Sequence, residues 1–143
     1  MEPNFHDGEF ILTDKLSYRF SPPQRGDVII FQAPINPDQD FIKRVIALPG
    51  EKVKVEKGHV YIDGRQLSET YLPAQTIVNP GAFIREGQQI TVERDNYFVL
   101  GDNRNHSSDS REWGLVPKKD LVGKAFLRYW PLNKLGLLPK VSY

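Results

Sequence analysis

Residues 97–117 read Tyr-Phe-Val-Leu-Gly-Asp-Asn-Arg-Asn-His-Ser-Ser-Asp-Ser-Arg-Glu-Trp-Gly-Leu-Val-Pro. The first four are apolar or aromatic, which predicts a strand over Tyr97–Leu100. The stretch from Gly101 to Pro117 then mixes amides, carboxylates, arginines and serines. Because short Asn, Asp and Ser side chains bond nearby backbone groups, this stretch is expected to hold a fixed shape without being helix or strand. A polar surface turn is the alternative.

Opposite charges inside this stretch indicate an internal clamp. Asp109 and Arg111 are close in the sequence, and a carboxylate with a guanidinium can form two parallel hydrogen bonds across a turn. We expect this pair to support the shape of the stretch without reacting.

Outside this stretch, the chain reads as short strands joined by turns. Glycine and proline are spread along it, with β-branched and aromatic runs between them. Strands are predicted over residues 10–13, 27–31, 41–48, 52–56, 59–62, 76–78, 89–92 and 122–130. Helix is expected only as one turn over residues 118–121, after a proline. The fold class is therefore mainly β, with antiparallel sheets and very little helix.

Two further local predictions concern the first 31 residues. The pair Pro22-Pro23 predicts an extended path over residues 15–24. The runs over residues 10–13 and 27–31 are nearly continuous in apolar residues, so both are expected in the core.

The strand predicted over residues 41–48 contains two basic residues in an apolar run. Alternation places Lys43 on one face with Phe41 and Val45, and Arg44 on the other face. Burial disfavours a charged amine and lowers the pKa of a lysine from about 10.4, which makes the amine a usable base near neutral pH. A lysine that guards a sheet edge or reaches water is the alternative.

The composition limits the classes of function. The chain has 143 residues, enough for one domain, and its 19 basic and 18 acidic residues give a net charge of +1. This balance argues against nucleic acid as a partner. The absence of cysteine excludes disulfides, thiolate metal sites and a cysteine nucleophile, and three scattered histidines predict no metal site. No run approaches the roughly 18 apolar residues of a membrane span.

Three stretches together resemble the conserved boxes of bacterial type I signal peptidases, the membrane-anchored serine proteases that remove signal peptides from exported proteins. Gly101 to Pro117 resembles the last box almost letter for letter. Asp40 to Gly50 resembles the box that carries the general base, and Met1 to Leu12 resembles the box with Ser-Met-x-Pro-Thr-Leu. Asn4 and Phe5 stand where that box has threonine and leucine.

This resemblance implies one signal peptidase catalytic domain over residues 1–143. Its fold is expected to consist of folded antiparallel sheets like those of signal peptidases and LexA. The core is expected over about 1–50 and 97–143, with a β-hairpin insertion over about 51–96.

The resemblance also implies a Ser/Lys dyad. Lys43 is the expected general base, Ser107 the hydroxyl that orients it, and Asp109 and Arg111 its structural support. The nucleophilic serine of the family would stand immediately before Met1. The chain as given is therefore expected to be a soluble and inactive piece of the enzyme.

Substrates of this family lie extended against shallow apolar pockets, which Met1, Phe5, Phe41 and Ile42 are expected to line by their positions. The expected partners are signal peptides of preproteins and the membrane surface, with neither metal nor cofactor. The full-length protein is expected in the bacterial cell membrane, with the catalytic domain outside the cytoplasm. Two alternatives stay open: a self-cleaving Ser/Lys protease of the LexA type, and a β-domain that binds peptides without cleaving them.

Overall fold

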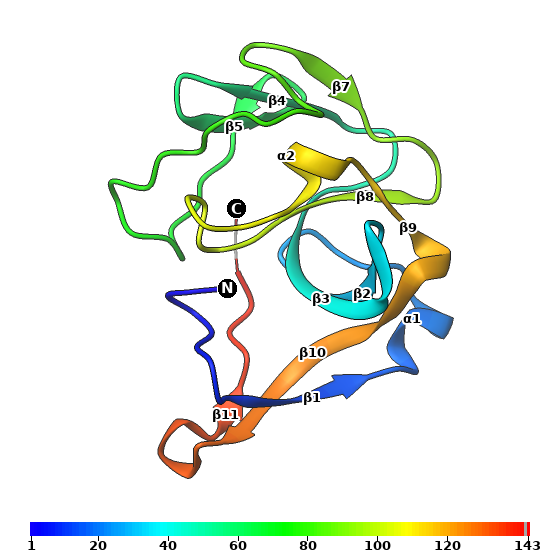
Figure 1. Cartoon of the computed structure of the whole chain (residues 1–143), viewed down its shortest axis with the longest axis vertical. Coiled ribbons are helices and arrows are strands. Elements are labelled where there is room, and N and C mark those ends of the chain that lie inside the picture. Colours follow the sequence, from blue (N-terminus) through cyan, green and yellow to red (C-terminus); the bar gives the residue numbers. More distant parts are fainter. Residues whose placement is uncertain (142) are drawn as a thin grey trace.

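The structure, a computed structural model, describes residues 1–141 and 143. Two antiparallel sheets make up most of it, one of seven strands and one of four (Figure 1). The seven-stranded sheet has the order β1-β10-β2-β3-β8-β9, with β11 beside β10. Its strands are β1 (Phe10–Asp14), β2 (Val28–Ala33), β3 (Asn36–Ala47), β8 (Asn96–Leu100), β9 (Val116–Pro117), β10 (Leu121–Trp130) and β11 (Gly136–Leu137).

The smaller sheet has the order β6-β5-β4-β7. It consists of β4 (Lys52–Glu56), β5 (His59–Ile62), β6 (Arg65–Gln66) and β7 (Gln89–Thr91). Helix occurs in the described residues only as short turns, namely α1 (Ser17–Phe20), α2 (Ser110–Trp113), η1 (Lys118–Asp120) and η2 (Leu132–Lys134). The prediction of a mainly β chain with antiparallel sheets and very little helix is confirmed.

β3 is a central strand of the larger sheet and carries Lys43. It pairs with β2 on one side and with β8 on the other, where Arg44 lies opposite Leu100. This antiparallel register brings Lys43 level with Gly101, the first residue of the polar stretch that follows β8. The pairing of β3 with β8 thus joins two of the three boxes at one level of the sheet.

The residues of β3 and β8 alternate between two cores. Val45 and Val99 pack on one face with Phe31 of β2. Ile46 and Phe98 pack on the other face, against valines that the smaller sheet contributes from β4 and β5. The smaller sheet lies at the top of Figure 1 and covers the central strands from that side. Because both faces of β3 are buried at this level, its side chains have fixed surroundings.

Two strand predictions need correction. No strand forms over residues 76–78, where Val78 donates a single backbone hydrogen bond of 2.9 Å to Gly58 instead of joining a ladder. β1 does form as predicted, but Phe10 is 54% exposed and Leu12 is 44% exposed, so only the face with Ile11 packs against a core cluster. β1 is an edge strand, and one of its faces is left uncovered.

Besides η2, two regions predicted to lack helix contain a short helical turn. Residues 15–24 include α1, because the Asp14 carboxylate accepts hydrogen bonds from the backbone amides of Leu16 and Ser17 and so begins the turn. The polar stretch after Gly101 contains α2, and Asp109 caps this turn by accepting from the backbone amide of Arg111. In both cases a local carboxylate supplies the missing acceptor.

Candidate active site

Lys43 lies in largely apolar surroundings. Its Nζ is 5.3 Å from the centre of the Phe41 ring, which packs against Phe31 and Trp113. Two carboxylates act on the amine electrostatically, Asp102 and Asp109, and each forms its ion pair with an arginine instead. Neither carboxylate forms an ion pair with the Lys43 amine, so neither holds the amine in its ammonium form.

The pKa of Lys43 is lowered from its ordinary value. Burial is the largest cause, because it disfavours the ammonium form. The negative charges of Asp109 and Asp102 oppose the change, and the positive charge of Arg111 adds to it. A neutral amine is thus available at lower pH than in a free lysine, as a general base requires.

Ser107 is brought to Lys43 through Gly101. A Cβ atom on Gly101 would lie 2.0 Å from Ser107 Oγ and 3.7 Å from Lys43 Cδ, so both side chains meet at the face of this glycine. Ser107 Oγ is buried and has no hydrogen-bond partner in the structure, although a buried hydroxyl usually finds one. No hydrogen bond joins it to Lys43 in the described residues. The hydroxyl is therefore left without a hydrogen bond beside the Lys43 side chain.

Asp109 and Arg111 form the internal clamp of the loop. Arg111 donates from Nε to Asp109 Oδ1 at 2.8 Å and from Nη2 to Oδ2 at 2.9 Å, and both side chains are almost fully buried. The same carboxylate accepts from the backbone amide of Gly101 at 3.1 Å. One side chain therefore fixes both the start of the loop and the turn that follows Ser107.

A second buried ion pair involves Arg44, the residue after Lys43 in β3. Arg44 donates from Nε and Nη2 to the two carboxylate oxygens of Asp102, at 2.9 and 2.7 Å. Asn4 also donates to Asp102, at 2.8 Å, and so joins the N-terminal segment to the same carboxylate. Asp102 thereby connects the three boxes.

The residues predicted to line the substrate pocket fall into two groups. Met1, Phe5 and Ile42 belong to one apolar cluster, and Phe5 is buried. Phe41 belongs to the aromatic cluster beside Lys43, on the opposite face of β3.

The N-terminal segment lies against the same loop. The backbone amide of Asp102 donates to the sulfur of Met1 at 3.3 Å. Burial lowers the pKa of the Met1 amino group, and the charge of Lys43 lowers it further. The start of the segment is thus close enough to Lys43 for the two charges to interact.

A match along most of the chain gives this arrangement its context. Residues 1–130 match the family model described as signal peptidase, peptidase S26. The chain belongs to this family.

Several curated members of the signal peptidase family are similar to the chain. A probable signal peptidase I-2 of Synechocystis sp. is 42% identical, over 96% of this chain and 62% of its own length. Signal peptidase I of Leptolyngbya laminosa is 42% identical, over 100% of this chain and 71% of its own length. Signal peptidase IB of Staphylococcus aureus (strain Mu50) is 32% identical, over 94% and 75%. The chain spans less than two thirds of the length of the Synechocystis relative.

A solved structure gives the same result. The crystal structure of a signal peptidase I from Enterococcus faecalis V583 superposes with a TM-score of 0.60 at 34% sequence identity. The match covers 73% of this chain and 97% of that one.

Several residues around the site of this signal peptidase family member were not predicted as site residues. Asp102, Asn4, Arg104, Glu69 and Tyr71 form or contact the buried ion pairs. Asp102 had a sequence signal, because it lies in the polar stretch and Arg44 needs a buried partner. Glu69 and Tyr71 had none, since they come from a loop without a recognisable motif.

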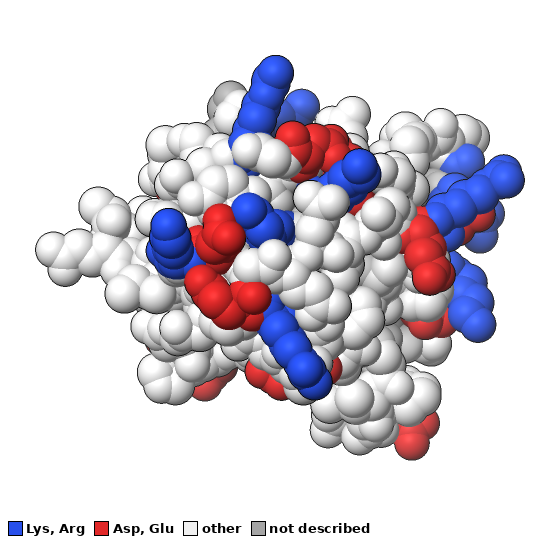
Figure 2. All heavy atoms as spheres, turned by 90° about the horizontal axis from the view of Figure 1, so that it is seen from above, with Lys and Arg blue, Asp and Glu red and all other residues white. Residues whose placement is uncertain are grey.

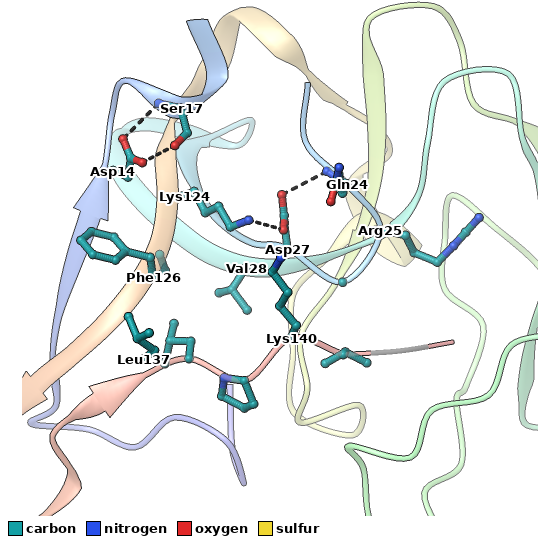
Figure 3. Close-up of a pocket in the computed structure, with 15 residues that line it drawn as sticks. Asp14, Ser17, Gln24, Arg25, Asp27, Val28, Lys124, Phe126, Leu137 and Lys140 are labelled. Carbon is teal, nitrogen blue, oxygen red and sulfur yellow. Dashed lines mark hydrogen bonds and ion pairs between the residues drawn. The ribbon is translucent and has the colours of Figure 1, made fainter. Parts of the chain in front are cut away.

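A separate cavity of about 540 Å³ lies outside this site (Figure 3). The start of β2, part of β10 and the segment after β11 line it, and Lys124 forms an ion pair of 2.6 Å with Asp27 there. Neither Lys43 nor Ser107 lines it. In residues 1–141 and 143, no group of three or more His, Asp or Glu side chains is arranged to hold a metal. No helix of the described chain has the length and apolar character to cross a membrane.

Proposed function

We propose that the chain carries the catalytic domain of a serine endopeptidase that removes signal peptides from exported proteins with a Ser/Lys dyad. The observation that carries this proposal is the pairing of Lys43, whose pKa burial lowers, with the buried and unbonded hydroxyl of Ser107 across Gly101. A base that is neutral and an adjacent hydroxyl that can aim it are the two groups that a serine nucleophile needs.

In the proposed mechanism, neutral Lys43 takes the proton of a serine hydroxyl as the serine oxygen attacks the scissile carbonyl carbon. The carbonyl π electrons move to the oxygen, which becomes the oxyanion of the tetrahedral intermediate. The resulting ammonium of Lys43 then gives its proton to the leaving amine, and the C–N bond breaks. Water attacks the acyl-enzyme with Lys43 again as base, and the serine and a free carboxylic acid are released.

Ser107 acts in this mechanism by orienting Lys43. A lysine amine rotates freely about its last bonds, so a hydrogen bond from a fixed hydroxyl favours the productive direction. Asp109 and Arg111 hold the loop that carries this hydroxyl. The serine that acts as nucleophile is assigned by the family resemblance to the position before Met1. The hydrogen bond from the backbone amide of Asp102 to the sulfur of Met1, which places the start of the segment at the loop that carries Ser107, supports this assignment.

The substrate is proposed to lie extended against the cluster of Met1, Phe5 and Ile42. Small side chains at the first and third positions before the cleaved bond point to the same side of an extended peptide and fit a shallow apolar surface. Phe41 lies on the other face of β3 and is proposed to act on Lys43 through burial.

The membrane surface is the proposed second partner. Exposed apolar and aromatic side chains gather on β1, the end of β10 and the residues up to β11, namely Phe10, Leu12, Tyr129, Trp130, Leu132, Leu135 and Leu137. Tyrosine and tryptophan favour the interface between lipid and water, so this apolar edge suits a bilayer surface. By contrast, the face above the smaller sheet carries interspersed charges of both signs (Figure 2).

The test uses the chain with one serine added before Met1, and the same chain with alanine added there as the matched control. The substrate is a synthetic peptide that spans a signal-peptide cleavage site with alanine at the first and third positions, and mass spectrometry identifies the products. We expect cleavage after the first of these positions by the serine variant alone. Equal cleavage by the alanine variant, or none by the serine variant, contradicts the proposal. Binding without cleavage favours a peptide-binding domain, and cleavage only within its own chain favours a self-cleaving protease.

A further inference from the structure

Arg104, in the loop after β8, is fixed by a residue far away in the sequence. Its side chain is fully buried, and it donates from Nη1 and Nη2 to the two carboxylate oxygens of Glu69, at 2.9 and 2.6 Å. Tyr71 completes the group: its hydroxyl accepts from Arg104 at 3.0 Å and donates to Glu69 at 2.9 Å. Glu69 and Tyr71 belong to the segment between β6 and β7. Each of these three side chains therefore forms hydrogen bonds with both of the others.

Arg104 passes this constraint to the candidate dyad. Its Nε donates to the backbone carbonyl of Gly101 at 3.0 Å, and Gly101 is the residue at whose face Ser107 and Lys43 meet. Its own backbone carbonyl accepts from Arg111 at 2.8 Å, which links it to the internal clamp. The position of the loop relative to Lys43 therefore depends on where Arg104 is held.

Tyr71 also contacts the two other boxes. Its ring lies under the guanidinium of Arg44, at 4.4 Å from the ring centre. Its backbone carbonyl accepts from the side chain of Asn4 at 3.3 Å. Through Arg104, Arg44 and Asn4, this one residue touches the loop after β8, the strand that carries Lys43 and the N-terminal segment.

We propose that Glu69 and Tyr71 are positioning residues for the dyad, which they hold through Arg104 without touching the substrate. This inference rests on the proposed function for its catalytic meaning. A buried arginine satisfied by two partners keeps one position, whereas a partly satisfied one shifts to find water. If the loop moves, Ser107 leaves Lys43 and water reaches the amine.

The experiment compares Tyr71→Phe and Glu69→Gln with a matched control, Glu56→Gln. Tyr71→Phe keeps the ring under Arg44 and removes only the hydroxyl. Glu69→Gln keeps the shape and removes the charge. Glu56 lies on the hairpin of the smaller sheet and pairs only with Lys54 among the described residues, away from the loop. Each change is made in the chain as given and in the chain with the added serine.

Three readouts are measured: kcat and KM with the synthetic peptide, the acid limb of the pH–rate profile, and amide hydrogen exchange over residues 101–107. We expect both variants to lose about 10- to 100-fold in kcat with KM nearly unchanged, because misplacement of the dyad affects the chemical step. The acid limb should move to higher pH, since water at Lys43 relieves its burial. The charged groups that face Lys43, namely Asp102, Asp109 and Arg111, are unchanged, and the Met1 amino group is a peptide nitrogen in the extended chain. Exchange over residues 101–107 should become faster, and Glu56→Gln should change none of the three.

Unchanged kcat in Tyr71→Phe and Glu69→Gln, with an active parent, overturns the inference and leaves the proposed function standing. An unchanged acid limb also overturns it, because a merely structural role lowers stability without altering the base. If the serine-extended parent is inactive, the proposed function fails. In that case, hydrogen exchange in the 143-residue chain still tests whether Glu69 and Tyr71 hold the loop. If neither variant changes exchange over residues 101–107, these two residues do not hold it.

Discussion

Gly101 lies directly against the side chain of Ser107. A Cβ atom at Gly101 would be 2.0 Å from Ser107 Oγ and 2.6 Å from Ser107 Cβ, which is closer than any real contact. The backbone of Gly101 is not in the left-handed region, so its lack of a side chain serves this close approach and no unusual turn.

Replacing Gly101 by alanine should therefore displace Ser107 from Lys43. We expect kcat of the serine-extended chain to fall about 100-fold, and overpacking to lower the free energy of unfolding by about 1–3 kcal/mol. Peptide cleavage and urea unfolding measure the two effects. Gly136→Ala is the control, because its Cβ would meet nothing within 4 Å. Full activity of Gly101→Ala would show that catalysis does not require Ser107 to lie beside Lys43.

Ser107→Ala separates orientation of the base from folding. Because the hydroxyl is buried without a partner, its removal should leave stability unchanged or slightly higher. Loss of the group that aims Lys43 should lower kcat by about 10- to 100-fold and leave KM nearly unchanged. Ser108→Ala is the neighbouring control, since Ser108 is exposed and accepts only from the Trp113 ring. A large change in KM would instead assign Ser107 to substrate binding.

Lys43→Met should abolish turnover and stabilise the fold. General acid–base groups contribute about 100- to 10,000-fold, so activity should fall at least that far. The pKa of Lys43 is lower in the folded chain than the 10.4 or so of an unfolded chain. Between these two values the unfolded state binds more protons, so the free energy of unfolding rises with pH. Methionine removes this slope. Urea unfolding at several pH values measures it, and an equal slope in the variant would mean that Lys43 is not the buried base.

Activity should follow the same titration. As pH rises through the lowered pKa of Lys43, the neutral amine becomes populated and the rate of the serine-extended chain should increase to a plateau. Addition of a chelator should not change the profile, since the proposed base is an amine. A pH–rate profile with and without chelator tests both statements. A flat profile, or loss of activity on chelation, would remove Lys43 as general base.

The buried pair of Arg44 and Asp102 should matter far more for stability than an exposed pair. Arg44→Met leaves the carboxylate buried without its partner, so we expect a loss of about 3–5 kcal/mol. Lys54→Met breaks the partly exposed pair with Glu56 and should change stability far less, because solvent screens such a pair. Similar losses in both variants, measured by urea unfolding, would contradict this ranking.

Most strands could be predicted from the sequence because their alternation reflects burial on one face. The hairpin of β4 and β5 is the clearest case, with Val53, Val55 and Val60 buried as the pattern requires. The side of β3 on which Lys43 lies followed from the same alternation, and its environment followed from Phe41 and Val45. These features depend on neighbours in the sequence or on a strand's own period.

The remaining features depend on contacts between distant residues. Nothing local in Glu69 or Tyr71 indicates that Arg104 would be buried beside them, because this contact arises only when the loops meet. Exposure of Phe10 was missed for a similar reason: an apolar run predicts a strand, but the position of that strand at the sheet edge is set by β10. At Asp14 the cause was local instead. Its carboxylate accepts from the amides of Leu16 and Ser17, and a helical turn forms where an extended path before Pro22 was expected.

The pairing of β1 with β10 has a consequence for the order of events during biosynthesis. Arg128 of β10 donates to the backbone carbonyl of Asn4, and its Nε lies 3.1 Å from Glu9 without an aligned hydrogen bond. A ribosome delivers β3 and the loop after β8 before it delivers β10, so Lys43 and Ser107 can meet first. β1, which follows the segment with Met1 and Phe5, has no partner strand until residues 121–130 emerge. The anchoring of this segment by β1 and by Arg128 is therefore completed only after Lys43 and Ser107 can already lie side by side.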